Sequence, residues 1–229
     1  WEAKAFDQAA ALTVSMVDST FIPYQPRLAE TLLNGFKEEK ISQAQWMWLA
    51  GSKGNLAHFW RKFEQAREQY HVMLTRAQAQ PDEDAIAVAF QRLGILYSES
   101  DTELAEQYYL DSLAIKKKLK DLSGQAQIYN NLGSLYIRQA RYVGAHEVLG
   151  QGLALREQIN SPEWQKLHLY GNMGQLYAEQ AHWEEATQYH EQTLAIAKTI
   201  GDSYQIALTT YNLGIDADRQ GNDELALTR

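Results

Sequence analysis

The chain has 229 residues, of which 45% are apolar, 22% are charged and none is cysteine. Such an apolar content supports a folded core, and the lack of cysteine excludes disulfides, thiol nucleophiles and cysteine-based metal sites. The formal net charge of −8 disfavours nucleic-acid binding, which relies on lysine and arginine to neutralise phosphates. No apolar stretch is long enough for a transmembrane helix, so we expect no membrane partner and a cytoplasmic location.

The first part of the chain shows helical patterns without a clear period. We expect residues 1–40 to form an irregular helical lead-in, in which one helix starts on Pro26 in its first turn. Residues 41–83 are interpreted as a degenerate helix-pair repeat. The two glycines of its "GSKGN" segment predict a turn, with Asn55 capping the next helix. The sequence does not begin with methionine and ends inside a helical pattern, so we expect it to be part of a longer protein.

From residue 84 to residue 229 a phrase built around Leu-Gly returns at a nearly fixed interval. An alanine follows each of its glycines at a nearly constant offset. These signature positions are Gly94, Gly133, Gly174 and Gly214, followed by Ala105, Ala145, Ala186 and Ala226. Apolar residues recur between them at helical spacing, and short breakers such as "QARY" separate the runs. Each period therefore predicts helix A, a tight turn and helix B.

A single pair of amphipathic helices cannot bury its apolar stripe, so the pairs are expected to stack. The sequence thus predicts an all-α solenoid of antiparallel helix pairs, with about three full repeats and a truncated fourth. Glycine inside a helix costs about 1 kcal/mol relative to alanine, so its recurrence needs a geometric reason. We expect each glycine of helix A to face the alanine of helix B, so that the two backbones approach closely.

The order of aromatic residue, Leu-Gly, Tyr and Ala resembles the tetratricopeptide repeat family. It is carried by Tyr129, Leu132, Gly133, Tyr136 and Ala145, and again by Tyr170, Met173, Gly174, Tyr177 and Ala186. The period of about 40 exceeds the family's usual ~34 residues. In this it is similar to the repeats of kinesin light chains, LGN/Pins scaffolds, Rap-type bacterial peptide receptors and STAND-type signalling ATPases. The resemblance implies a right-handed superhelix. His190, Thr210 and Ala217 depart from the family's repeat pattern.

The concave wall of such a solenoid is made mostly by helix A. At 3.6 residues per turn, the positions 2 before, 1 after and 5 after each glycine share the face of helix A that lies opposite the core. We call this face the A-stripe. It contains Arg92, Asn131, Asn172 and Asn212, then Ile95, Ser134, Gln175 and Ile215, and finally Glu99, Arg138, Glu179 and Arg219.

The three asparagines of the A-stripe are the main candidates for ligand binding. A planar amide carries donors and an acceptor, and so can bind a peptide backbone bidentately. In the long-period relatives, Asn at this position of helix A holds an extended peptide, and the resemblance implies the same role for Asn131, Asn172 and Asn212. The alternative is that these amides bond between neighbouring helices or lie in solvent.

The charges of the A-stripe alternate in sign from one repeat to the next. The arginines could clamp carboxylates of a ligand, but we favour the interpretation that each charge pairs with the opposite charge of the next repeat. The basic run "IKKKLK" (115–120) could be a partner patch, but such a run at a helix end is more often a solvated face.

No motif for catalysis is present: the sequence lacks a complete phosphate loop, an HExxH pair and a GxSxG elbow. We therefore expect a non-enzymatic module without cofactor or metal, which binds a protein or peptide and acts as a sensor or scaffold region of a larger, bacterial signalling protein. Intramolecular contact with further domains is a second possible kind of partner. The alternatives are a structural spacer or oligomerisation arm, and a regulatory arm of an enzyme such as a STAND-type ATPase.

Overall fold

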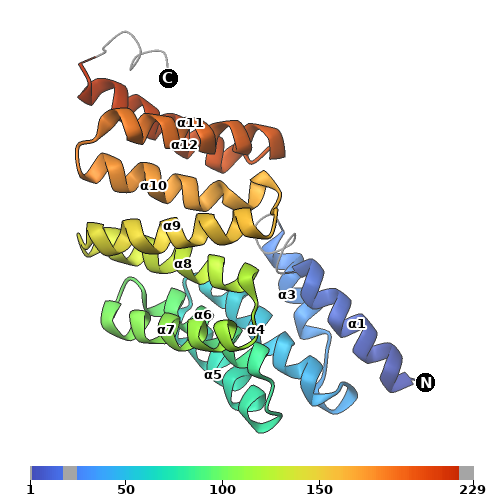
Figure 1. Ribbon diagram of the computed structural model, residues 1–229. Coiled ribbons are helices and arrows are strands. Elements are labelled where there is room, and N and C mark those ends of the chain that lie inside the picture. The colour runs from blue at the N-terminus through green and yellow to red at the C-terminus, as the bar shows by residue number, and fades with distance from the viewer. Residues whose placement is uncertain (1, 18–24, 222–229) are drawn as a thin grey trace. The chain divides into compact units, whose positions relative to one another are not determined.

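The computed structural model of the chain describes residues 2–17 and 25–221 (Figure 1). These residues are helical and include no strand, which confirms the all-α prediction. None of the described helices combines the length and the apolar character that crossing a bilayer requires. The chain forms two compact units, residues 1–119 and residues 120–229. They are called the N-terminal unit and the C-terminal unit below.

The N-terminal unit begins with two helices and then forms two helix pairs. Its elements are α1 (Glu2–Met16), α3 (Pro26–Asn34), the 3-10 turn η2 (Glu38–Lys40), α4 (Gln43–Phe59), α5 (Phe63–Ala79), α6 (Glu83–Tyr97) and α7 (Thr102–Lys118). As expected, α3 starts on Pro26. The pairs α4–α5 and α6–α7 are each joined by a short turn, so their helices run antiparallel and side by side (Figure 1).

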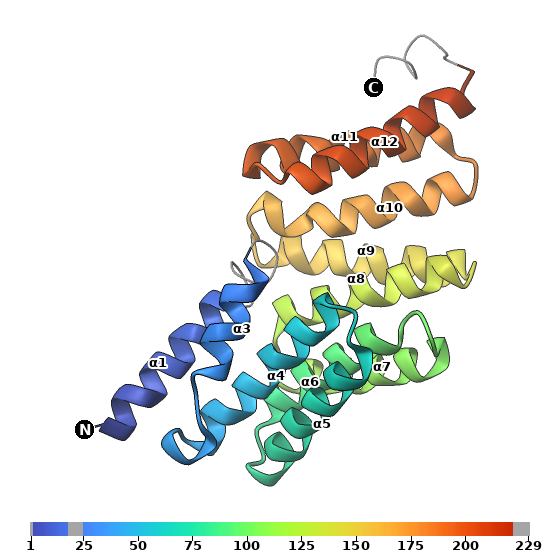
Figure 2. The ribbon, with the colours of Figure 1, turned by 180° about the vertical axis from the view of Figure 1, so that it is seen from behind.

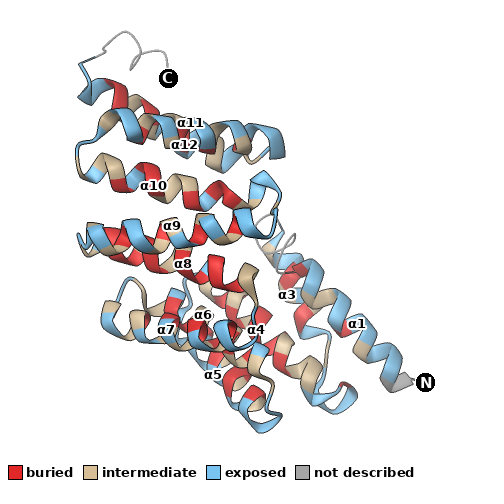
Figure 3. Cartoon of the chain, in the orientation of Figure 1, coloured by how far each residue is buried: buried red, intermediate tan, exposed pale blue. Residues whose placement is uncertain are grey.

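The C-terminal unit continues the alternation of helix A and helix B. Its elements are α8 (Leu122–Arg138), α9 (Tyr142–Gln158), the 3-10 turn η3 (Glu163–Lys166), α10 (Leu167–Glu179), α11 (Trp183–Ile200) and α12 (Ser203–Arg219). The helices follow one another in space in chain order, as both views show (Figures 1 and 2). Buried residues gather on the sides of α8 to α11 that face neighbouring helices (Figure 3).

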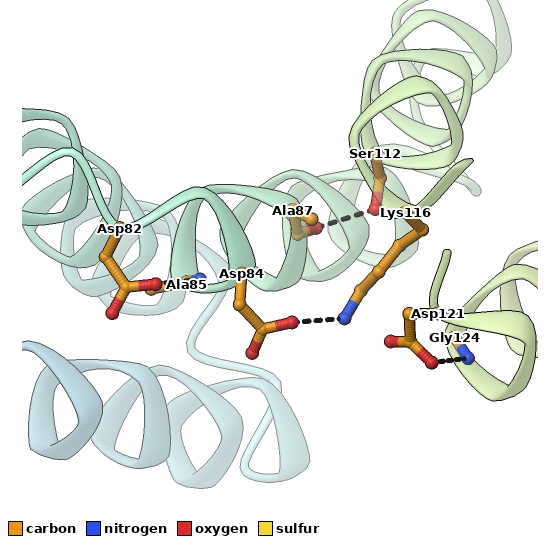
Figure 4. A network of polar contacts seen from close by, with 8 residues as sticks. All are labelled: Asp82, Asp84, Ala85, Ala87, Ser112, Lys116, Asp121 and Gly124. Carbon is orange, nitrogen blue, oxygen red and sulfur yellow. Dashed lines mark hydrogen bonds and ion pairs between the residues drawn. The ribbon is translucent and has the colours of Figure 1, made fainter. Parts of the chain in front are cut away.

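Aspartates fix the start of several helices. In each case Oδ1 accepts a hydrogen bond from the backbone N–H three residues later, at 2.9–3.0 Å. The capping residues are Asp82 of α6, Asp101 of α7, Asp121 of α8 and Asp202 of α12. Figure 4 shows the contact for Asp121. Such a bond satisfies one of the free N–H groups of the first turn and so sets where the helix begins.

The repeat glycine faces a large side chain, not the alanine that the sequence analysis paired with it. A Cβ on Gly94 would clash with the ring of Tyr109, and one on Gly133 would clash with Leu149. On Gly174 it would clash with His190. In each repeat the partner thus stands one helical turn beyond the alanine on helix B. The glycine makes room for a side chain of helix B to pack against helix A. Ala226 lies outside the described residues.

The same contact occurs in the α4–α5 pair, where the sequence analysis predicted a turn. Helix α4 runs through both glycines of "GSKGN", so that prediction is wrong. A Cβ on Gly54 would clash with Tyr70, and Ala66, one turn before Tyr70 on α5, is fully buried. Asn55 caps no helix; its Oδ1 accepts a hydrogen bond from the Tyr70 hydroxyl at 3.0 Å. Gly54 therefore extends the repeat register by one further period toward the N-terminus.

The basic run at the end of α7 is not simply a solvated face, which corrects the favoured interpretation. Lys116 is buried, and its Nζ lies 2.5 Å from Oδ1 of Asp84 on α6 (Figure 4). Lys118 forms an ion pair with Glu83 at the same end of α6. Nearby, the Ser112 hydroxyl donates to the Ala87 carbonyl at 2.7 Å. These contacts tie helix B of this repeat to its own helix A.

A buried polar pair replaces two apolar positions of the repeat in the C-terminal unit. His190 of α11 stands where the preceding repeats have Tyr109 and Leu149, and Asp216 of α12 stands where they have leucine. The His190 Nδ1 lies 2.7 Å from Asp216 Oδ2, and their side chains are 3% and 1% exposed. The other edge of the imidazole packs against Gly174.

The glycine contact predicts opposite effects for two glycine-to-alanine changes. Gly133→Ala should destabilise the protein by about 1–2 kcal/mol, because overpacking against Leu149 outweighs the gain in helix propensity. Gly150, in α9, has no atom within 4 Å of its would-be Cβ, so Gly150→Ala should stabilise by about 1 kcal/mol. Urea denaturation followed by circular dichroism measures both; equal effects of the two changes would contradict the packing argument.

The His190–Asp216 pair predicts strong coupling between the two positions. Either His190→Leu or Asp216→Leu alone should cost about 3–5 kcal/mol, because each leaves one buried polar partner unpaired. The double variant should recover most of this loss, because it restores an apolar contact between α11 and α12. A double-mutant cycle by urea denaturation measures the coupling, and additive losses would show that the two side chains do not interact.

Candidate functional site

The A-stripe of the C-terminal unit lies along α8, α10 and α12. Its three asparagines, Asn131, Asn172 and Asn212, are each partly exposed on a successive helix A. The positions one and five residues after the glycine are also accessible: Ser134 is partly exposed, and Arg138, Gln175, Ile215, Glu179 and Arg219 are exposed. The helical register derived from the glycines therefore places these side chains where a ligand can reach them.

A hollow of about 450 Å³ is formed by α10, α11 and α12. Five residues of the A-stripe line it: Gln175, Glu179, Asn212, Ile215 and Arg219. Its other lining residues are Ala178, Trp183, His190, Leu208 and Asp216. The structure thus brings together side chains from two consecutive helices A, which belong to different periods of the sequence. We call this feature the α10–α12 hollow.

The α10–α12 hollow combines amides, charges and apolar surface. Asn212 and Gln175 offer donors and acceptors, while Leu208 and Ile215 are 41% and 37% exposed and provide apolar contact. Glu179 and Arg219 form no ion pair with each other within the described part of the chain. The expected pairing of charges between neighbouring repeats is therefore not met here. The buried His190–Asp216 pair also lines the hollow and adds polar groups beneath the exposed ones.

The three asparagines are in different hydrogen-bonding states. Asn172 Nδ2 donates to Asn130 of α8, at 2.9 Å from Oδ1 and 3.4 Å from the carbonyl oxygen. No hydrogen bond joins the side chain of Asn131 or Asn212 to another described residue. A bond between neighbouring helices, one of the two alternatives for these amides, is thus present at Asn172 and not at the other two.

In the N-terminal unit, Arg92 does not line the hollow that the A-stripe residues Ile95 and Glu99 share. The Arg92 guanidinium packs over Gly51, with Nη1 3.6 Å from the sulfur of Met73, and is only partly exposed. Glu99 lines a separate, mainly apolar hollow of about 530 Å³ together with Ile95 and His58.

The hollow around Glu99 combines charged side chains, including Glu64 and Arg67, with a histidine whose pKa is lowered. Desolvation lowers the pKa of His58, the Glu99 carboxylate opposes this shift, and the Arg61 guanidinium adds to it. Because the resulting pKa lies below the usual 6.5, the imidazole is neutral at pH 7. Phe63, 41% exposed, and Ile95, 38% exposed, supply apolar surface beside it.

Metal ligands are not grouped in the described ranges, where no cluster of three or more His, Asp or Glu residues could hold an ion.

Three residues that matter for the site were not predicted from the sequence: Asn130, Leu208 and Asp216. Asp216 had a visible signal, since it interrupts a column of leucines two residues after the repeat glycine. Asn130 had none, because its role depends on which neighbouring helix its amide reaches.

Residues 124–199 match the family model described as tetratricopeptide repeat. Among curated proteins, none matches the sequence significantly. The matched segment begins within α8 and ends within α11, and it contains the signature glycines Gly133 and Gly174.

Solved structures show the same fold at low sequence identity. BtubC from P. vanneervenii is 20% identical with a TM-score of 0.67, covering 100% of this chain and 88% of that one. NprR in complex with its cognate peptide NprX is 15% identical (TM-score 0.73, 97% and 65% coverage). A Rap protein complexed with Competence and Sporulation Factor is 16% identical (TM-score 0.75, 87% and 56%). The resemblance inferred from the sequence is therefore confirmed: residues 124–199 carry tetratricopeptide repeats, and the described helix pairs on either side share the fold of that family.

Proposed function

We propose that the chain binds an extended peptide, or an unstructured segment of a protein, on the A-stripe of its C-terminal unit. The observation that carries this proposal is the α10–α12 hollow, which is lined by five side chains of the predicted A-stripe. An extended peptide has an unpaired N–H and C=O at each residue, and amides at regular spacing match such a backbone. The apolar surface of Leu208 and Ile215 offers contact to its side chains.

The structural neighbours support a peptide as the ligand. The NprR structure contains its cognate peptide NprX, and the Rap structure contains Competence and Sporulation Factor. This chain spans 65% and 56% of those two proteins, so the likeness concerns their repeats and not their whole function. We propose by analogy that the chain is the sensor or scaffold region of a larger signalling protein and is itself not catalytic.

A selection experiment tests peptide binding although the natural ligand is unidentified. A random library of displayed dodecapeptides is selected on the chain, and the tightest synthetic peptide is titrated by fluorescence anisotropy. Asn212→Ala should weaken its binding about 3- to 10-fold, the worth of one or two hydrogen bonds. Removing all three asparagines, at 131, 172 and 212, should weaken it about 100-fold.

Gln188→Ala is the matched control, since Gln188 is exposed on α11 and does not line the α10–α12 hollow. It should leave the affinity unchanged, and circular dichroism should show the same helix content in all variants. A peptide whose affinity survives the triple change would bind elsewhere and would overturn the proposal. A library that yields no saturable binder would favour the alternative of a spacer or oligomerisation arm.

A further inference from the structure

The contact between Asn172 and Asn130 fixes the direction of the Asn172 amide. Its Nδ2 lies 3.4 Å from the backbone carbonyl oxygen of Asn130 and 2.9 Å from that residue's Oδ1. A backbone carbonyl can only accept a hydrogen bond, so the group that faces it has to be the NH2 of Asn172. Exchanging the positions of the amide nitrogen and oxygen would place that oxygen against the backbone carbonyl oxygen of Asn130, which is also an acceptor. The orientation therefore follows from chemistry.

In this orientation, the atom of the Asn172 amide that remains for a ligand is its oxygen, Oδ1. Both contacts use the NH2 group, whereas no residue in the described ranges donates to the Asn172 Oδ1. Asn172 is partly exposed on α10, so this oxygen is available as an acceptor. A ligand acceptor placed against this oxygen would form no hydrogen bond with it, and binding of that ligand would be disfavoured.

The repeat register explains why only some asparagines are held in this way. Asn130 stands three residues before its repeat glycine, and Asn172 stands two residues before the next one. The residue that would correspond to Asn130 beside Asn212 is Gly171, which has no side chain to accept a bond. Asn212 therefore keeps both its donors and its acceptor toward the α10–α12 hollow.

We propose that Asn130 is a positioning residue that makes Asn172 a hydrogen-bond acceptor, so that the bound segment has to present a donor over α10. In an extended peptide this donor is a backbone N–H, and proline, which lacks one, is excluded at that position. Asn131 and Asn212 place no such demand, because each amide can both donate and accept. The inference rests on the proposed peptide binding and adds a position-specific requirement to it.

The arrangement of the two asparagines is tested first without a ligand. In the 15N-labelled chain, the side-chain NH2 of Asn172 should exchange with solvent several-fold more slowly than that of Asn212. Asn130→Ala should remove part of this protection, whereas Asn130→Asp should keep it, because a carboxylate accepts the same bond. Equal exchange at the two asparagines, or no effect of Asn130→Ala, would overturn the assignment whatever the ligand is.

The requirement for a donor is tested with the selected dodecapeptide. Each of its backbone amides is replaced in turn by an ester, which exchanges N–H for oxygen. One replacement should weaken binding to the wild-type chain about 3- to 10-fold. The same replacement should have no effect on Asn172→Ala, and Asn130→Asp should behave as wild type.

The outcomes separate the inference from the proposed function. If no ester replacement depends on Asn172, the donor requirement is wrong although peptide binding stands. If the selection yields no binder, peptide binding fails together with the donor requirement, while the exchange measurement still decides whether Asn130 positions Asn172. A loss of affinity in Asn130→Ala that Asn130→Asp does not share supports positioning by the acceptor at residue 130.

Discussion

The helix pairs depend on one packing contact: a side chain of helix B packs against a glycine of helix A. Tyr70, Tyr109, Leu149 and His190 make this contact in successive repeats. Without a Cβ at the glycine, the two helices can come close enough to bury both this side chain and the alanine one turn before it. The contact also fixes the rotation of helix A. Which residues reach the open face, including the asparagines of the A-stripe, follows from that rotation.

The α10–α12 hollow is a consequence of this rotation. Because consecutive helices A have the same register, residues one period apart present equivalent faces, and their side chains meet across the gap between the helices. The shared register also determines which residues meet in the core, as the His190–Asp216 pair shows. His190 packs on the glycine of one repeat and has its partner in the next, because Asp216, two residues after Gly214, lies beside it. The A-stripe and the contacts in the core thus both follow from the rotation of helix A.

The sequence predicted the helix pairs, their period and the open face, because all three follow from spacing along the chain. It paired Gly94, Gly133 and Gly174 with the wrong residue, since the alanine and the residue one turn beyond it lie on the same side of helix B. Within the predicted repeat of residues 41–83 it placed a turn at "GSKGN", which has the composition of a turn but lies inside α4, where Gly54 packs against the Tyr70 ring. Partners such as Asn130 and Asp216 depend on distances between helices, which spacing does not contain.

The pairing of His190 with Asp216 constrains how this array can evolve. Repeat proteins commonly change length when a whole period is duplicated or deleted, because each repeat offers the same faces to its neighbours. Here one half of a buried polar pair stands in one period and the other half in the next. Inserting a period between them would bury an aspartate and a histidine without partners. These two repeats are therefore expected to stay adjacent and in fixed order.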